Sequence, residues 1–301
     1  MNQELIHIGF PKTASTWLQE NLFPLVRNMD VASTEEIFQW IIRPHAFHFD
    51  AEKVRNYFLT RYKKPLIISQ ENLLGFMNLG GHNGVMTKEL GQRLHDVFPE
   101  ARIIIFTRNQ TDLIASAYFN YVQNGGTYGI NKFLFHQANK SLLFSFHYLE
   151  FDKLITYYHS LFGEENVHVF PYEKLQSNPQ KFIRSFIETF DLEILQEAID
   201  FSPKNKRYRA GLLRMVRLLN IFTHERTLYK YYCISIPGWY STTRRLYKRM
   251  NAWKVFGRYP SSAHILGVKN VEYIRNFYRE SNASLQRLLP SEKLAELGYP
   301  M

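Results

Sequence analysis

Leu5-Ile6-His7-Ile8-Gly9-Phe10-Pro11-Lys12-Thr13-Ala14-Ser15-Thr16-Trp17 is the stretch of sequence that decides the fold. An apolar strand, Leu5–Gly9, leads into a short turn that carries one lysine and several hydroxyl residues, and a helical pattern follows over Ser15–Asn28. A strand, a tight turn and a helix N-terminus align backbone N–H groups, which together favour a bound phosphate or sulfate. The sequence therefore predicts an anion-binding turn close to the N-terminus.

The predicted turn differs from the nucleotide-binding Walker pattern. That pattern is G-x-x-x-x-G-K-[ST], in which the Ser or Thr after the lysine holds Mg²⁺. Here no second glycine lies between Gly9 and Lys12, and the lysine comes early in the turn. We therefore expect a shorter loop that contacts fewer phosphates, and no metal ion at the site.

A second segment also indicates an anion site. Ala101-Arg102-Ile103-Ile104-Ile105-Phe106-Thr107-Arg108 is an apolar run that ends in a cation, a pattern typical of a central parallel strand. A helical pattern follows, and Ser116 lies two turns into it. At the end of a strand the planar guanidinium of Arg108 is suited to a phosphate. The alternative is that Arg108 forms an ion pair with Asp112.

Together the two segments resemble the motifs of sulfotransferases that use 3′-phosphoadenosine 5′-phosphosulfate (PAPS). The family patterns are P-K-[ST]-G-[ST]-T-x-[LIF] and R-[ND]-P-x-D-x-x-x-S-x-[YW]. This chain departs from them at Ala14, where the family commonly has glycine, and at Gln110, where it has proline. A methyl group at position 14 requires a negative φ, which we expect there. A weaker third match, Tyr172 to Pro179, resembles Y-E-[DK]-L-x-x-[ND]-P.

The resemblance implies roles for individual residues. Lys12 would donate to the oxygen that leaves the sulfuryl group, and Glu71 would take the proton of the acceptor. His82 would be the reserve base on the substrate side. The implied cofactor contacts are Thr13, Ala14, Ser15, Thr16, Trp17, Arg108, Ser116, Tyr172, Lys206, Arg207 and Tyr208.

Structural alternatives stay open for several of these residues. Trp17 and Tyr172 are also consistent with packed aromatic side chains. Glu71 is also consistent with a carboxylate that caps a helix or forms an ion pair. The segment Lys204–Arg209 is equally consistent with a solvated run of charge.

The expected elements alternate between strand and helix along the chain. The strands are Leu5–Gly9, Leu66–Ser69, Arg102–Thr107 and Val167–Pro171; the helices are Ser15–Asn28, Met86–Phe98, Asp112–Asn124, Phe151–Phe162, Pro179–Phe190 and Val271–Leu289. This order predicts an α/β fold, a P-loop NTPase-like parallel sheet with helices on both faces. Ligands bind beyond the carboxyl ends of such strands, where Lys12, Glu71, Arg108 and Tyr172 are expected. We expect one domain over residues 1–301.

Charge is concentrated in one part of the chain. The net charge is +10, from 37 Lys and Arg against 27 Asp and Glu. Residues 204–258 contain 14 Lys and Arg, many aromatic residues and a single acid, Glu225. Such a surface suits a polyanion, sugar rings or a membrane. We therefore expect a saccharide, glycolipid or polyanionic acceptor, with peripheral membrane contact as a further possibility and no nucleic acid. For the helical pattern over Gly211–Phe222 we favour packing in the core.

Two other functions stay open, a P-loop small-molecule kinase and a nucleic-acid-binding protein; the latter is motivated by the basic, aromatic segment.

The single cysteine, Cys233, excludes an internal disulfide and fits a reducing compartment. The sequence shows no signal peptide and no apolar run of about 18 residues. We therefore expect a cytoplasmic protein, with the inner membrane face as an alternative location.

Overall fold

The computed structural model describes residues 3–75, 77, 84–138, 141–194, 199–202, 207–227 and 230–301. Two of the predicted site residues, His82 and Lys206, lie outside the described residues. All other predicted site residues lie within them.

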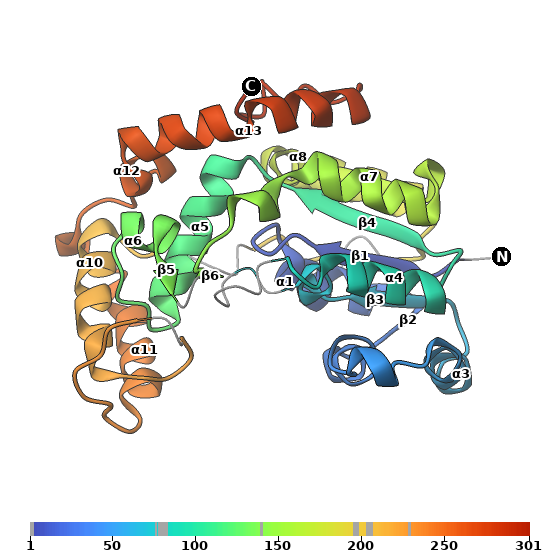
Figure 1. Cartoon of the computed structure of the whole chain (residues 1–301), viewed down its shortest axis with the longest axis horizontal. Coiled ribbons are helices and arrows are strands. Elements are labelled where there is room, and N and C mark those ends of the chain that lie inside the picture. The colour runs from blue at the N-terminus through green and yellow to red at the C-terminus, as the bar shows by residue number, and fades with distance from the viewer. Residues whose placement is uncertain are drawn as a thin grey trace.

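The centre of the described structure is a parallel sheet of five strands in the order β2-β3-β1-β4-β7 (Figure 1). The strands are β1 Leu5–Gly9, β2 Asp30–Val31, β3 Leu66–Ser69, β4 Arg102–Thr107 and β7 Val167–Pro171. On the central strand, Ile6 pairs with Ile68 on one side and with Ile103 on the other. The four predicted strands are confirmed with their bounds. The edge strand β2 was not predicted, because two residues make no recognisable pattern.

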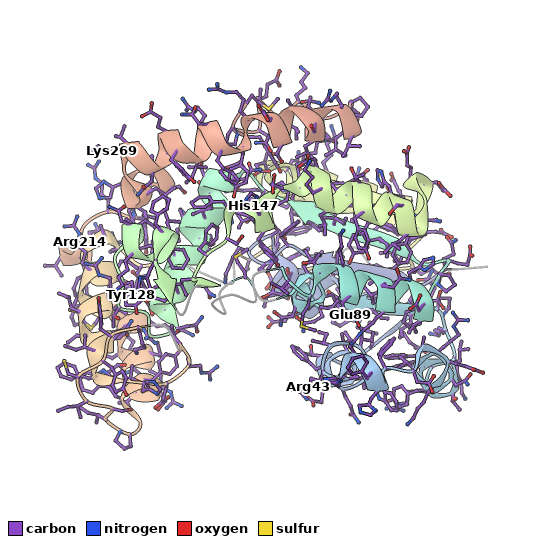
Figure 2. All side chains as sticks on the ribbon, in the orientation of Figure 1. Arg43, Glu89, Tyr128, His147, Arg214 and Lys269 are labelled. Atoms are coloured by element: carbon purple, nitrogen blue, oxygen red, sulfur yellow. The ribbon has the colours of Figure 1, made fainter. Side chains whose placement is uncertain are left out.

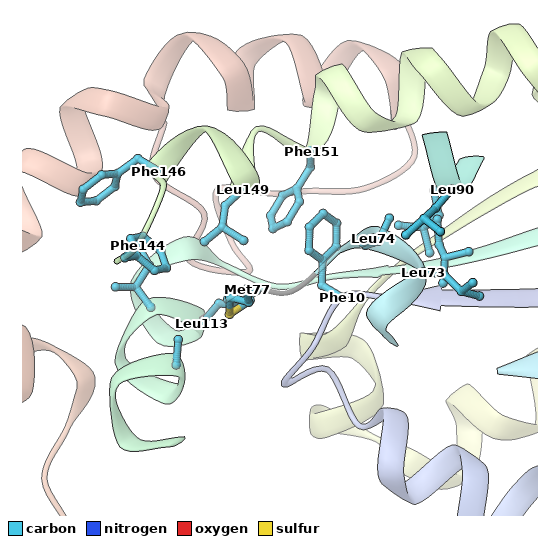
Figure 3. Packing of buried hydrophobic residues seen from close by; sticks show 14 of the residues in the cluster. Phe10, Leu73, Leu74, Met77, Leu90, Leu113, Phe144, Phe146, Leu149 and Phe151 are labelled. Carbon is cyan, nitrogen blue, oxygen red and sulfur yellow. The ribbon is translucent and has the colours of Figure 1, made fainter. Parts of the chain in front are cut away.

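Residues alternate between the two faces of the sheet, and each face has its own core. Ile103 and Ile105 belong to one buried cluster, whereas Ile104 and Phe106 belong to the other. Both faces are therefore buried, which explains the unbroken apolar run of β4. Figure 3 shows part of the first cluster, where Phe10 and Leu74 lie near Phe151.

Helices cover both faces, as predicted. The first core contains residues of α3 Ala51–Arg61, α4 Thr87–Val97, α5 Gln110–Gln123, α7 Phe151–Phe162 and α13 Val268–Leu288. The second contains residues of the π-helix η1 Leu18–Leu22, which continues α1 Ser15–Trp17, and of α9 Pro179–Phe190. The remaining helices are α2 Thr34–Ile37, α6 Ile130–Phe135, α8 Tyr172–Ser177, α10 Ala210–Leu219, α11 Trp239–Met250 and α12 Ser262–Leu266.

Some predicted helix ends are wrong. The first helical stretch, expected to reach Asn28, ends with the 3₁₀ turn η2 Phe23–Leu25. Helix α5 begins at Gln110, two residues before the expected start, because the side chain of Asn109 caps it by accepting a hydrogen bond from the Asp112 N–H at 2.9 Å.

The basic segment folds onto α5 through α10. Leu212 and Val216 of α10 lie in the first buried cluster, so its apolar face is core, as we favoured. At its end, the Asn220 amide donates to the carbonyls of Val122 and Gly126, both at 2.8 Å. Within the described residues, none of the helices combines the length and apolar character needed to cross a membrane.

Candidate active site

A cavity of about 630 Å³ lies at the carboxyl ends of β1, β4 and β7. This volume is within the roughly 300–1,000 Å³ of ligand-binding cavities. The predicted residues in its wall are Lys12, Ala14, Ser15, Thr16, Trp17, Glu71, Arg108, Ser116, Tyr172 and Arg207. The structure therefore brings together residues from five separate segments of the chain, at the edge of the sheet where they were expected.

The turn after β1 has an unusual backbone. Lys12 and Ala14 both have a φ of 69°, in the left-handed region. The expectation of a negative φ at Ala14 is therefore wrong. The Thr13 hydroxyl donates to the Phe10 carbonyl, and the Ser15 hydroxyl donates to the same oxygen at 3.3 Å, which closes the turn in this conformation. A left-handed φ costs a residue with a Cβ roughly 1–2 kcal/mol, which the glycine of the family motif avoids.

The hydroxyl residues of the turn are not equivalent. Thr13 is fully buried and its hydroxyl points back to Phe10, so Thr13 does not line the cavity. Ser15 is buried but reaches the wall, and Thr16 is exposed at it. Of the three predicted hydroxyl contacts, two therefore lie at the cavity.

Lys12 is held in place by α5. Its ammonium Nζ donates to Asn120 Oδ1 at 3.0 Å, and its carbonyl accepts from Arg108 Nη1 at 2.8 Å. Burial lowers the pKa of Lys12; the negative charge of Glu71 acts against this, and the positive charge of Arg108 adds to it. Asn120 was not predicted as a site residue. It lies one helical turn after Ser116, on the same face of α5, and this spacing could have indicated it.

Arg108 has the strongest geometry for an anion. Only 9% of its surface is exposed, and its guanidinium lies 4.7 Å from the centre of the Tyr172 ring. Its Nε has no hydrogen-bond partner in the described structure. A buried N–H group without a partner is costly, so this atom is available for an acceptor oxygen in the cavity.

The alternative pairing of Arg108 with Asp112 is not seen. Among the described residues no ion pair joins them; instead the Asp112 carboxylate accepts hydrogen bonds from Asn109, at 3.0 Å, and from Ser262. Burial acts to raise the pKa of Asp112, but these hydrogen bonds and the nearby Arg108 lower it overall. The Asp112 carboxylate therefore already has hydrogen-bond partners. It does not occupy the guanidinium of Arg108, which can bind another anion.

Arg207 joins the cavity from the basic segment. Its Nη1 donates to Ser262 Oγ at 3.4 Å, and its guanidinium lies 5.6 Å from the centre of the Phe119 ring. Burial lowers the pKa of Arg207, and the charge of Arg108 lowers it further. The neighbouring Tyr208 was predicted as a cofactor contact, but it packs in the hydrophobic core and not in the cavity wall. That prediction is corrected: consecutive residues of an extended chain point to opposite sides.

Glu71 lies at the start of the 3₁₀ turn η5 Glu71–Leu74, next to the turn after β1. A Cβ on Gly9 would come within 3.5 Å of Glu71 Cα, and Gly9 has a φ of 120°, so only glycine fits there easily. The capping alternative does not hold, because Gln70 caps η5 by accepting from the Asn72 N–H at 3.2 Å. No ion pair of Glu71 is found within the described ranges, and its carboxylate faces the cavity that Lys12 also lines.

An aromatic wall lies beside the cations. Trp17 stacks against Phe201, with ring centres 5.8 Å apart, and its Nε1 donates to the Asp200 carbonyl at 2.8 Å. Both rings reach the cavity, so Trp17 is more than a core residue. The wall also contains residues that follow no recognisable motif and were not predicted, among them Phe201, Ser202, Gln123 and Gln176.

The solved structures that this chain resembles include three sulfotransferases of low sequence identity. The enzyme from Alicyclobacillus acidocaldarius is 17% identical over 68% of this chain and 87% of its own, with a TM-score of 0.49. Mouse SULT7A1 complexed with PAP is 14% identical over 97% and 89%, with a TM-score of 0.46. The sulfotransferase domain from the Curacin biosynthetic pathway is 12% identical over 92% and 97%, with a TM-score of 0.36.

A search of curated proteins finds no significant relative. By contrast, residues 79–197 match the sequence model of the sulfotransferase family. The matched range contains Arg108, Ser116 and Tyr172, three of the residues that the structure places around the cavity. The match covers 119 of the 301 residues, and over this range the chain is similar to the sulfotransferase family.

Proposed function

We propose that this protein is a sulfotransferase that uses PAPS as donor and transfers the sulfuryl group to a hydroxyl or amine of a saccharide or glycolipid. The observation that carries the proposal is the convergence of Lys12, Arg108 and Arg207 on one cavity at the end of the sheet. Arg108 is buried and keeps an unpartnered Nε, while Lys12 and Arg207 are half-buried.

The charges around the cavity fit a nucleotide with several negative groups. Three cations face two carboxylates, and one of these, Asp112, is already satisfied by Asn109 and Ser262. Burying cations without a counter-charge is unfavourable, so an anionic ligand would stabilise the arrangement. The N-terminus of α1 adds backbone N–H groups on the same side.

The residues divide into binding and reacting groups. When bound, PAPS would supply the sulfuryl group, and the rest of the nucleotide would leave as adenosine 3′,5′-bisphosphate. Arg108, Ser116 and Arg207 would hold the phosphate at one end of the nucleotide, and Trp17 with Phe201 would offer an aromatic face to its adenine. Tyr172 orients the guanidinium of Arg108 from below.

The reacting groups would be Lys12 and Glu71. The Lys12 ammonium, fixed by Asn120, would donate to the oxygen that gains charge as the bond to sulfur breaks. Glu71 would take the proton of the acceptor on the opposite side of the sulfuryl group. Because the charge of Glu71 raises the pKa of Lys12, it helps to keep the proton on the lysine.

A saccharide acceptor is supported by a second cavity, of about 300 Å³, lined by Phe10 and Leu74. Its wall contains the rings of Tyr148 and Tyr157, together with Lys88 and Lys153. Leu74 belongs to the same 3₁₀ turn as Glu71, so this cavity adjoins the turn that carries the proposed base. Aromatic faces beside cations suit a sugar ring that carries acidic groups.

The proposal is tested by calorimetry with adenosine 3′,5′-bisphosphate, the product nucleotide. Wild type should bind it, and Arg108→Ala should weaken binding about 10- to 100-fold through loss of charge-assisted hydrogen bonds. The matched control is Arg102→Ala, which removes the arginine at the other end of β4, where it bonds Thr189 far from the cavity.

An equal loss of nucleotide affinity in Arg108→Ala and Arg102→Ala would contradict the proposal. So would the absence of nucleotide binding by folded wild type. A sulfation assay with PAPS over saccharide, glycolipid and phenol acceptors then tests the acceptor class. Activity with PAPS that survives EDTA is expected. Turnover of ATP that EDTA abolishes would favour a kinase instead.

A further inference from the structure

The loop between α10 and α11 exposes a run of apolar side chains. All residues from 231 to 238, Tyr-Tyr-Cys-Ile-Ser-Ile-Pro-Gly, are exposed, and Ile234 shows 63% of its surface. In Figure 1 this loop, coloured orange, projects beyond the ends of α10 and α11 and away from the sheet. Large apolar side chains gathered on a projecting loop usually mark an interaction site.

The loop is anchored at its backbone although its side chains face outward. The Cys233 N–H donates to the Ile221 carbonyl at 2.9 Å, and the Ile236 N–H donates to the Phe222 carbonyl at 3.1 Å. At its start, the Lys132 ammonium lies 4.0 Å from the centre of the Tyr231 ring. Ile234, between the two anchored residues, is therefore presented on a fixed support.

The surface next to the loop is strongly basic. Between Lys230 and Tyr259 the sequence has six Lys and Arg residues and no Asp or Glu. Helix α11 buries Thr243 and Tyr247 and turns Arg245, Lys248 and Arg249 to solvent. Figure 2 shows the exposed Arg214 on the outer side of the neighbouring α10, at the edge of the molecule.

An exposed apolar loop beside basic side chains is best suited to one class of partner. A nucleic acid would contact the cations but would gain little from exposed isoleucines. An anionic bilayer takes both, because aliphatic side chains enter the boundary of the acyl chains, tyrosines lie at the headgroup level, and Lys and Arg contact acidic headgroups. We propose that loop 231–238 and the outward face of α11 form a docking surface for an anionic membrane.

The single cysteine of the chain provides a direct test. Cys233 is exposed and lies within the loop, so a polarity-sensitive dye attached to it reports on the loop alone. The full-length protein is mixed with vesicles of phosphatidylcholine, with or without phosphatidylglycerol. With the anionic vesicles, the emission of the dye should shift to shorter wavelength, and the protein should sediment with these vesicles.

Two variants separate the apolar and the charged contributions. Ile234→Ser should weaken vesicle binding about tenfold. The double change Lys248→Gln and Arg249→Gln should weaken it about 10- to 30-fold.

Each variant has a matched control on the opposite side of the molecule. Leu59→Ser, on α3, removes an aliphatic residue of 64% exposure, and Lys63→Gln with Lys64→Gln removes an exposed basic pair. Both controls should bind vesicles as wild type does.

Several results would overturn the proposal. One is that wild type does not bind anionic vesicles, and another is that the Ile234→Ser variant binds them as wild type does. A dimer in sedimentation that Ile234→Ser returns to monomer, without vesicle binding, would make the loop a contact between two copies. Tight binding of duplex DNA without vesicle binding would assign the surface to nucleic acid. None of these readouts depends on sulfuryl transfer.

Discussion

The cavity at the end of the sheet and the outer surface of α10 and α11 both contain several basic side chains, but these side chains differ in their exposure to solvent. In the cavity, Arg108 is buried and Lys12 is half-buried, and each is fixed by hydrogen bonds to its neighbours. On α11, Lys248 and Arg249 are exposed to solvent. A buried charge is weakly screened and acts at one point, whereas exposed charges act together and lose strength in salt. The first region can recognise and activate one anion; the second suits an extended anionic surface.

Removal of Lys12 should strongly lower activity and tests the cavity side of this comparison. Lys12→Ala should lower turnover about 10²- to 10³-fold, because the charge that forms on the leaving oxygen loses a buried donor. Affinity for adenosine 3′,5′-bisphosphate, measured by calorimetry, should stay within a few-fold, since Arg108 and Ser116 remain. Lys53→Ala, an exposed lysine of α3, is the control. Lost affinity with spared turnover would mean that the role of Lys12 is assigned wrongly.

Removal of the proposed base tests whether the cavity holds reacting groups as well as binding groups. Glu71→Gln should lower turnover about 10²- to 10⁴-fold at unchanged nucleotide affinity, because the amide cannot accept the proton of the acceptor. Steady-state rates with saturating PAPS measure this effect. Glu52→Gln, an exposed carboxylate of α3, should retain the wild-type rate. A near wild-type rate for Glu71→Gln would move the base to another residue.

Lys230 sharpens the comparison, because it is a buried cation within the exposed basic region. Only 8% of its surface is exposed, its Nζ has no partner in the described structure, and burial lowers its pKa to about 8, from 10.5. Between these values the unfolded chain holds the proton and the folded protein does not, so stability rises with pH through this window.

Lys230→Met should therefore be more stable than wild type by roughly 1–3 kcal/mol at neutral pH. The difference should shrink as the pH rises toward 10.5. Urea unfolding at several pH values measures it. Lys248→Met, an exposed lysine of α11, should change little at any pH. A destabilised Lys230→Met at neutral pH would show that this charge has a partner.

The smallest effect is expected at the turn that supports Lys12. Ala14→Gly should stabilise the protein by about 0.5–1 kcal/mol, because glycine accepts the left-handed φ of 69° and offsets only part of this gain through its greater freedom when unfolded. Ala263→Gly in α12, where φ is not positive, should destabilise by a similar amount. Chemical denaturation measures both, and a change of the same sign in the two variants would argue against strain at Ala14.

Much of the fold was readable from the sequence for a simple physical reason. Strands β1, β3 and β4 are buried on both faces, so they leave largely apolar runs, and the edge strand β7 is recognisable although its centre is only half-buried. The short edge strand β2 leaves none, and helix ends such as the start of α5 depend on a cap from Asn109. Local sequence patterns predict buried segments well, but they predict helix caps and edge strands poorly.

The candidate site divides in the same way. Lys12, Arg108 and Ser116 were predictable because strand, turn and helix place them at fixed short spacings. Arg207 and Phe201 reach the cavity from a distant segment without periodic pattern, and only the packed chain shows that Arg207 faces the cavity while Tyr208 enters the core.

The sequence by itself determined the parallel sheet, the turn after β1 and the residues at the strand ends, because each depends on neighbours along the chain. Tertiary structure alone decided which cations share one cavity, the left-handed φ of Ala14 and the partner of Lys12. The contact between Lys12 and Asn120 joins residues that are 108 positions apart. Such contacts depend on how helices pack on the sheet, and this information is spread over the whole chain.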